Sequence, residues 1–202
     1  MPYTPALLVI DMQNALMPLA HRAAETTEVI AGLRRRALAA GVPVVTVQHR
    51  GAELVPGTDG WRTVPALAPA AGEPVVHKTS ADSFLATDLD RTLKALGVTE
   101  VIVTGFATEI CVDTTARQAL SHGYDLLLVA DGHTTSERDG EGDYVAPARS
   151  IAHHNEIFRH LDFPGRGIRV RPAAGVDFGA DTPRRTRPDR ARNVGSSRVG
   201  PS

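Results

Sequence analysis

The sequence predicts an α/β fold: a six-stranded parallel sheet covered by helices on both faces, in a three-layer, doubly wound arrangement. Short apolar runs without polar alternation recur along the chain, as in strands that are buried on both faces of a parallel sheet. Segments with apolar residues at helical spacing separate these runs, and this alternation is typical of α/β domains. The hydrophobic content of 42% suffices for one core in a chain of 202 residues.

The expected strands are the apolar runs at residues 6–10, 42–47, 74–76, 101–103 and 125–129, with a weaker sixth at 168–170. Helical patterns occupy residues 29–38, 89–96, 112–120 and 151–161. Glycines at 41, 97 and 123 are placed to end the first three helices. Two irregular stretches, 50–72 and 132–143, are expected to be loops. A loop of about twenty residues in a compact domain is usually functional or disordered.

Composition limits the partners and the compartment. The net charge of −1 gives no electrostatic case for binding nucleic acid or an acidic membrane surface. No apolar run approaches the roughly 18 residues of a membrane span, and the first residues lack the pattern of a signal peptide. A single cysteine excludes an internal disulfide and fits a reducing compartment. We expect a cytoplasmic protein that binds neither nucleic acid nor membrane.

The C-terminal segment differs from the rest of the chain. Residues 180–202 hold six arginines and two aspartates, which gives this segment a charge of +4 and little to bury. We expect a globular domain over residues 1–179 and a disordered tail over 180–202. The tail could bind a polyanion, although a solvated tail is the simpler interpretation.

The lone cysteine, Cys111, is the first candidate for chemistry. It follows the expected strand at 101–103 and precedes a helical pattern, so it should lie in the first turn of a helix at the sheet edge. There the helix dipole and free backbone N–H groups favour the thiolate. The alternative is a small buried hydrophobic residue, which is the commoner role of a single cysteine.

Polar residues stand at the ends of the expected strands, where open α/β sheets bind ligands. They are Asp11; Gln48 and His49; His77 and Lys78; Thr108 and Cys111; and Asp131. A carboxylate, an ammonium and a thiol form a working set: the thiolate attacks a carbonyl, the carboxylate moves the proton, and the ammonium stabilises both anions. Each residue alone has a structural explanation, as a cap or a surface charge. Only their joint placement indicates a site.

At these positions the chain resembles the isochorismatase-like cysteine hydrolases. The resemblance rests on residues 9–14, Lys78, the block 104–117, residues 123–124 and residues 130–132, and it covers roughly residues 5–175. The block around Cys111 is the most specific part. The resemblance implies a six-stranded parallel sheet and assembly into homodimers or homotetramers.

The resemblance also implies site roles. Asp11, Lys78 and Cys111 would form the catalytic triad. A cis peptide bond would join Phe106 to Ala107, and the amides of Ala107 and Cys111 would form the oxyanion hole. Gln13 would lie near the pocket and contact substrate.

The chain departs from the nicotinamidases of this family, which carry an Asp-x-His pair and a further histidine for a metal. Here the sequence is Val47-Gln48-His49-Arg50, and one histidine without an acidic partner is a poor metal site. We therefore expect no metal and no other cofactor. His49 either hydrogen-bonds substrate or has a structural role.

The predicted function is hydrolysis of a C–N bond in a small amide, carbamoyl, ureido or lactam substrate through a thioester. Trp61, Phe84 and Phe106 are candidate pocket walls, with Trp61 alternatively a plug that fixes the 50–72 loop. Family members that open cyclic amides, such as streptothricin hydrolase, are models for the substrate. Two alternatives stay open: a vinyl ether hydrolase of the isochorismatase type with Asp11 as the acid, and a non-catalytic binding module.

Overall fold

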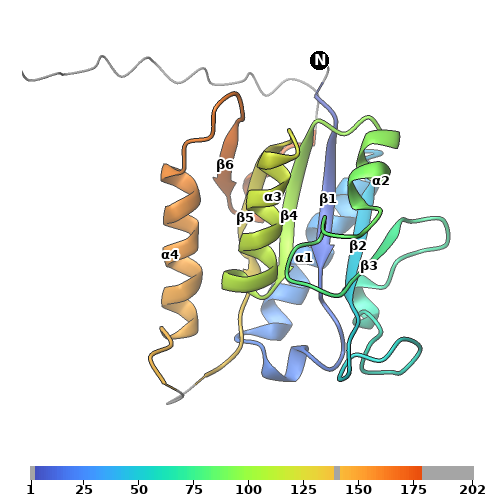
Figure 1. Ribbon diagram of the computed structural model, residues 1–202, viewed down its shortest axis with the longest axis vertical. Coiled ribbons are helices and arrows are strands. Elements are labelled where there is room, and N and C mark those ends of the chain that lie inside the picture. Colours follow the sequence, from blue (N-terminus) through green and yellow to red (C-terminus); the bar gives the residue numbers. More distant parts are fainter. Residues whose placement is uncertain (1–2, 139–141, 179–202) are drawn as a thin grey trace, which may run out of the picture.

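The computed structural model describes residues 3–138 and 142–178 of the chain. Its strands are β1 (Pro5–Ile10), β2 (Val44–His49), β3 (Val75–Lys78), β4 (Glu100–Phe106), β5 (Asp125–Thr134) and β6 (Ile168–Arg171). Its α-helices are α1 (Ala23–Ala39), α2 (Leu89–Ala95), α3 (Asp113–Ser121) and α4 (Pro147–His160) (Figure 1). Short helical turns are η1 (Met17–Leu19), η2 (Pro65–Leu67), η3 (Thr108–Val112) and η4 (Ala173–Gly175).

The six strands form one parallel sheet in the order β3-β2-β1-β4-β5-β6. The chain starts in the middle at β1, proceeds to one edge, and returns to continue from β4 to the other edge (Figure 1). The strand order therefore reverses between β1 and β4. The predicted fold class is confirmed, since every expected strand is present and all of them are parallel.

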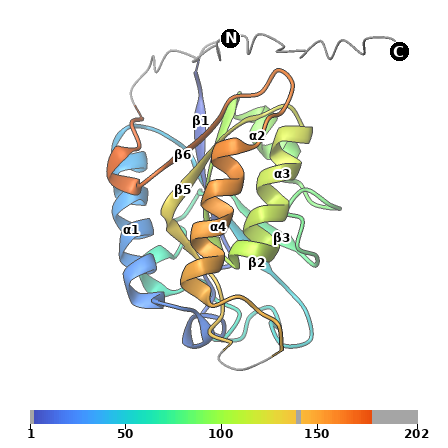
Figure 2. The same cartoon turned by 90° about the vertical axis from the view of Figure 1, so that its left-hand side faces the viewer.

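Helices cover both faces of the sheet. Figure 2 shows α1 on one side and α3 and α4 on the other. The core is accordingly divided in two: one cluster contains side chains of α2, α3 and α4, and the other contains those of α1 with η1, η2 and η4. The strands separate the clusters by the alternation of their side chains, because Leu8 and Ile10 belong to the first and Leu7 and Val9 to the second.

One expected boundary is wrong. The polar Asp131 was expected to end the fifth strand, but β5 continues to Thr134. The register between β4 and β5 shifts, from Val103 opposite Leu128 to Gly105 opposite His133. The apolar pattern breaks over these irregular residues while the strand itself resumes, so hydrophobicity alone does not mark its end.

The tail expected over residues 180–202 lies outside the described residues. Within the described ranges, none of the helices combines the length and the apolar character needed to cross a membrane.

Candidate active site

The site lies where the strand order reverses, at the carboxyl ends of β1 and β4, which is the place where open α/β sheets bind ligands. Asp11 directly follows β1 and has a φ of 52°. Aspartate adopts this left-handed conformation more readily than most residues. Its backbone N–H donates to Val47 O, which fixes it against the end of β2. Asp11 is therefore held by the two neighbouring strands.

Lys78 joins the other two candidates. Its Nζ lies 2.7 Å from Asp11 Oδ2 and 3.1 Å from Cys111 Sγ, and it donates a further hydrogen bond of 2.9 Å to Ser80 O. The Asp11 and Lys78 side chains are almost fully buried, while Cys111 is partly exposed. The structure thus brings the carboxylate, the ammonium and the thiol together, as the strand ends predicted.

The electrostatics differ from the sequence-based expectation. Burial, and after it the charge of Asp11, raise the pKa of Cys111 to about 11, although Lys78 acts in the opposite direction. Burial also raises the pKa of Asp11, against the influence of Lys78. Burial and the neighbouring carboxylate therefore oppose the stabilisation of the thiolate that a helix N-terminus would give. The arrangement instead suits transfer of the thiol proton to a carboxylate beside it.

Cys111 lies in η3, a π-helical turn that leads directly into α3. Such turns are rare and frequently occur at functional sites. The peptide bond between Phe106 and Ala107 is cis. The Ala107 carbonyl accepts hydrogen bonds from the N–H groups of Ile110 and Val112, which closes the turn around the two amides expected to form the oxyanion hole.

His49, at the end of β2, lies beside the triad. Lys78, Asp11 and the backbone of Ser80 all influence its titration, and burial, followed by Lys78, lowers its pKa. The imidazole is therefore neutral near pH 7. It is partly exposed, so it remains available to a substrate.

Gln13 is placed differently from the expectation. Its side chain is completely buried, donating to His49 O (3.0 Å) and Trp61 O (2.8 Å) and accepting from His49 N (2.9 Å). Both amide hydrogens are thus used by the backbone. The expected substrate contact stays a prediction, and in the structure Gln13 holds the 50–72 loop against the end of β2.

Trp61 contacts a neighbouring residue of Lys78 on β3. Its ring lies 5.3 Å from the His77 ring, measured between centroids. His77 and Lys78 are consecutive residues of β3, so their side chains point to opposite faces of the sheet. Lys78 contacts Cys111, and Trp61 therefore packs on the other face, which supports the alternative role of fixing its loop.

Phe84 and Phe106 are both buried in the core clusters. The Phe84 ring stacks on His122 at 4.5 Å, beyond the end of α3 that is remote from Cys111. Phe106 belongs to the cluster beneath α1, whereas Cys111 packs against the cluster on the opposite face. Their contact with substrate stays a prediction, because a strand-end or loop position does not specify which face a side chain takes.

One residue of this region was missed. His133 lies in the resumed part of β5 and is 2% exposed, with its Nδ1 2.8 Å from Thr108 Oγ1 and its Nε2 3.1 Å from Asn155 Oδ1. It contacts the first residue of the turn that carries Cys111. The sequence signal was a histidine soon after a strand, but it fell in a stretch expected to be a loop.

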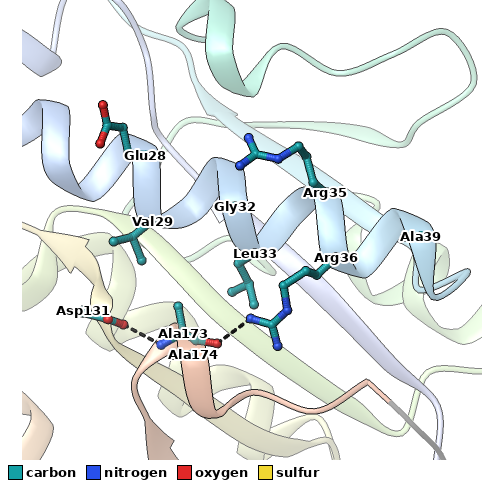
Figure 3. Close-up of a pocket in the computed structure, with 10 residues that line it drawn as sticks. All are labelled: Glu28, Val29, Gly32, Leu33, Arg35, Arg36, Ala39, Asp131, Ala173 and Ala174. Atoms are coloured by element: carbon teal, nitrogen blue, oxygen red, sulfur yellow. Dashed lines mark hydrogen bonds between the residues drawn. The ribbon is translucent and has the colours of Figure 1, made fainter.

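Figure 3 shows a separate, open hollow of about 510 Å³ on the α1 face. It is lined by Glu28, Val29, Gly32, Leu33, Arg35, Arg36, Ala39, Asp131, Ala173 and Ala174. Its charged residues are of both signs, and none of the triad residues lines it. Among the described residues, no three His, Cys, Asp or Glu side chains are grouped as a metal site.

Comparisons with known proteins agree with this geometry. The isochorismatase domain model matches residues 5–149. A streptothricin hydrolase of Streptomyces noursei is 40% identical over 189 residues, which cover 84% of this chain and 74% of that protein. A further match to streptothricin hydrolase of the same species is 41% identical over 136 residues, and there the alignment spans about half (49%) of the relative's length.

Two other relatives extend the comparison. The ureidoacrylate amidohydrolase of Methylobacterium radiotolerans is 30% identical over 172 residues, covering 64% of this chain and 67% of that protein. The crystal structure of an isochorismatase from Pseudomonas putida KT2440 superposes with a TM-score of 0.77 at 27% identity, covering 88% of this chain and 93% of that chain. The sequence match over most of the domain and the shared fold lead to one conclusion: this chain belongs to the isochorismatase family of hydrolases.

Proposed function

We propose that this protein is a cysteine hydrolase that cleaves the C–N bond of a small amide, carbamoyl, ureido or lactam substrate through a thioester. The observation that carries the proposal is the position of Lys78 Nζ, within 2.7 Å of Asp11 Oδ2 and 3.1 Å of Cys111 Sγ. A buried ammonium between an acid and a thiol stabilises each anion as a proton moves between them.

The first half of the reaction forms the thioester. Asp11 takes the proton of the Cys111 thiol, and the sulfur attacks the substrate carbonyl carbon. The oxyanion that develops receives hydrogen bonds from the amides of Ala107 and Cys111, and one such donor typically contributes about 3 kcal/mol. Asp11 then gives its proton to the departing nitrogen as the C–N bond breaks. The raised pKa of Asp11 favours this second transfer.

The second half returns the enzyme to its starting state. Asp11, again ionised, takes a proton from water, and the oxygen of the water attacks the thioester carbonyl. The C–S bond breaks, and Asp11 returns the proton to the Cys111 sulfur. The products are a carboxylic or carbamic acid and an amine or ammonia. Lys78 stays protonated throughout, and no metal takes part in these steps.

The relatives support a C–N bond as the target. Two of them are a streptothricin hydrolase and a ureidoacrylate amidohydrolase. The higher identity to streptothricin hydrolase makes streptothricin the first compound to test, followed by ureides and simple lactams. His49 is the substrate contact that the geometry favours, because it is neutral, partly exposed and adjacent to Lys78.

The test is turnover of a panel of streptothricin, ureides, imides, lactams and isochorismate. For any amide that the wild type cleaves, we expect Cys111→Ala and Asp11→Asn to lose at least about 1,000-fold in kcat. Asp131→Asn is the matched control, because this exposed carboxylate at the same sheet edge bonds Ala173 N instead of the triad. Cleavage of isochorismate that survives Cys111→Ala would select the vinyl ether alternative and overturn the proposal.

A further inference from the structure

The turn that carries Cys111 is fastened to the rest of the protein by its first residue. Thr108 Oγ1 lies 2.8 Å from His133 Nδ1, on β5, and His133 Nε2 lies 3.1 Å from Asn155 Oδ1, on α4. Asn155 Nδ2 in turn donates to Ala130 O at 3.0 Å. Thr108, His133 and Asn155 are all buried. None of these residues takes part in the proposed chemistry, so their polar network requires another explanation.

The network fixes the position of every proton in it. The Ala130 carbonyl can only accept, so the Asn155 amide presents its nitrogen there and its oxygen to His133. His133 Nε2 must then carry the proton, and in a neutral ring Nδ1 is an acceptor. The Thr108 hydroxyl therefore donates to His133 Nδ1. The side chains of Asn155, on α4, and His133 together fix the orientation of this hydroxyl.

The imidazole stays neutral in this environment. Burial lowers the pKa of His133 to about 4, with smaller influences from His154, Asp131 and Glu109. The Nε2–H tautomer is thus the form present across the neutral range. In the neutral ring, Nδ1 accepts the hydrogen bond from the Thr108 hydroxyl. In a protonated ring Nδ1 would be a donor, and this hydrogen bond would be lost.

The next residue of the turn, Glu109, is also bonded to residues near the end of β5 and on α4. Glu109 accepts hydrogen bonds from Thr135 Oγ1 at 2.6 Å and Ser150 Oγ at 3.3 Å, and Arg138 Nη1 lies 3.1 Å from its Oε1. Residues 108 and 109 are thus both tied to the end of β5 and to α4. Cys111 follows two positions later, within the same helical turn.

We propose that His133 is a positioning residue, which acts through the Thr108 hydroxyl to hold the Cys111 turn in its reactive geometry. Its effect on catalysis rests on the proposed function, but its effect on the thiol does not. The ring sits behind the turn and does not touch the triad. A loosened turn would move Sγ away from Lys78 and shift the amides of Ala107 and Cys111.

Alkylation by iodoacetamide tests the effect on the thiol without any substrate. Cys111 is the only cysteine in the chain, so the reaction reports this sulfur alone. In the wild type the thiol is partly exposed and lies beside Asp11 and Lys78, and burial, followed by the charge of Asp11, raises its pKa to about 11. In Thr108→Val, which removes only the hydroxyl, we expect a lower apparent pKa, toward the ordinary value of about 8.5, and alkylation at pH 8 at least about tenfold faster.

Substitutions of His133 test its two hydrogen bonds separately, the one at Nδ1 with Thr108 and the one at Nε2 with Asn155. His133→Asn places an oxygen near the position of Nδ1 and should keep the wild-type alkylation profile. His133→Gln reaches toward Asn155 but offers Thr108 no acceptor, and it should behave like Thr108→Val. Thr108→Ser keeps the hydroxyl and should restore the wild-type profile. If His133→Gln does not fold, the two Thr108 variants decide the matter alone.

Thr104→Val is the matched control, because it removes a buried hydroxyl that donates to Leu8 O on the neighbouring strand and does not touch the turn. A similar acceleration in this variant, or a wild-type alkylation profile in folded Thr108→Val, would overturn the proposal.

If the wild type cleaves an amide, Thr108→Val should lower kcat for that amide about 10- to 100-fold at nearly unchanged KM. If no amide is cleaved, the proposed function fails while alkylation still decides the role of His133.

Discussion

At the residue scale, the buried ion pair of Asp11 and Lys78 dominates the energetics of the site. Both side chains are almost fully shielded from water, and their charged atoms are 2.7 Å apart. Removing two charges from water is costly, and their attraction repays the cost only while both partners are present. The pair is therefore a poor source of stability but a strong constraint on substitution.

Lys78→Met tests this constraint. It leaves Asp11 buried without its partner, so we expect a loss of about 3–5 kcal/mol in the free energy of unfolding. Adding Asp11→Asn should recover part of the loss, because the buried charge disappears with its partner. Lys94→Met is the control: it breaks an exposed pair with Asp90 and should cost at most about 0.5 kcal/mol. Urea unfolding measures the wild type, the two single variants, the double variant and the control, and strictly additive losses at positions 11 and 78 would contradict the coupling.

His133 predicts a pH dependence of stability. Its pKa in the folded protein, about 4, is below the usual 6.5, so between these values the unfolded chain binds a proton that the folded chain does not. Its contribution is complete above pH 6.5 and is lost as the pH falls toward 4, by about 3 kcal/mol in all. Unfolding free energies of wild type and His133→Asn, compared from pH 7 to pH 4, should diverge accordingly. Parallel curves would show that the ring does not titrate in this way.

The proximity of Asp11, Lys78 and Cys111 could be predicted from the sequence because a strand end is visible as the last residue of an apolar run. Asp11 and Lys78 follow such runs, and Cys111 follows one after a short turn. The face a side chain takes is not visible in this way. Phe84 and Phe106, for example, are buried in different core clusters, and this placement depends on packing between distant segments.

At the element scale, the Gln13 side chain joins the 50–72 loop to the end of β2 through three hydrogen bonds. Gln13→Met keeps the length of the side chain but removes the Gln13 amide from His49 N, His49 O and Trp61 O. At roughly 1 kcal/mol for each lost bond, we expect a loss of about 3 kcal/mol. Asn14→Ala removes an exposed bond to Asp59 O in the same loop and should cost under about 1 kcal/mol.

Trp61 is the only tryptophan, so its fluorescence reports this loop directly. In Gln13→Met we expect the emission to shift to the red at urea concentrations below the main transition seen by circular dichroism. In Asn14→Ala the two transitions should coincide. Coincident transitions in both variants would mean that Gln13 does not hold the loop.

The pairing of β1 with β4 requires a glycine at position 105. Gly105 has a φ of +126°, and an added Cβ would lie 2.1 Å from Ile10 O. Gly105→Ala should therefore separate the strands beside the site and cost about 3 kcal/mol or more. Gly72→Ala is the matched control, with a φ of +89° and no atom within 4 Å of the added Cβ, and should cost about 1 kcal/mol. Equal urea unfolding midpoints for Gly105→Ala and Gly72→Ala would contradict the close approach of β1 and β4 at Gly105.

The resumed part of β5 shows why elements are harder to predict than single strand ends. Apolar residues end at Ala130, and Asp131 and Gly132 look like the start of a loop. The strand nevertheless resumes against β4, with Gly105 opposite His133 and Phe106 opposite Thr134. This pairing is made by partners about thirty residues away, which no local pattern records, and His133 was missed for this reason.

At the scale of the whole molecule, the fold itself was predictable, because buried parallel strands and intervening helices leave strong periodic signals. The order of the strands in the sheet was harder to predict from the sequence. It is the reversal between β1 and β4 that brings Asp11 and the Cys111 turn together, while β2 separates β1 from β3. Lys78 spans that distance with its long side chain, which explains why a lysine suits this strand end.

Self-association stays a prediction. The family resemblance implies a homodimer or homotetramer, and we expect light scattering after size exclusion to give two or four times the chain mass of 21.5 kDa. A mass of one chain across micromolar concentrations would contradict that expectation without affecting the triad, since all three of its residues come from a single chain.

The shared position of Asp11, Lys78 and Cys111 is tested most directly by intact-mass spectrometry of the protein quenched during turnover of a cleaved amide. We expect a mass increase equal to the acyl part of the substrate, located by digestion on the peptide containing Cys111 and absent in Cys111→Ala. Turnover at the wild-type rate by Cys111→Ala, with no acyl group on that peptide in the wild type, would contradict it.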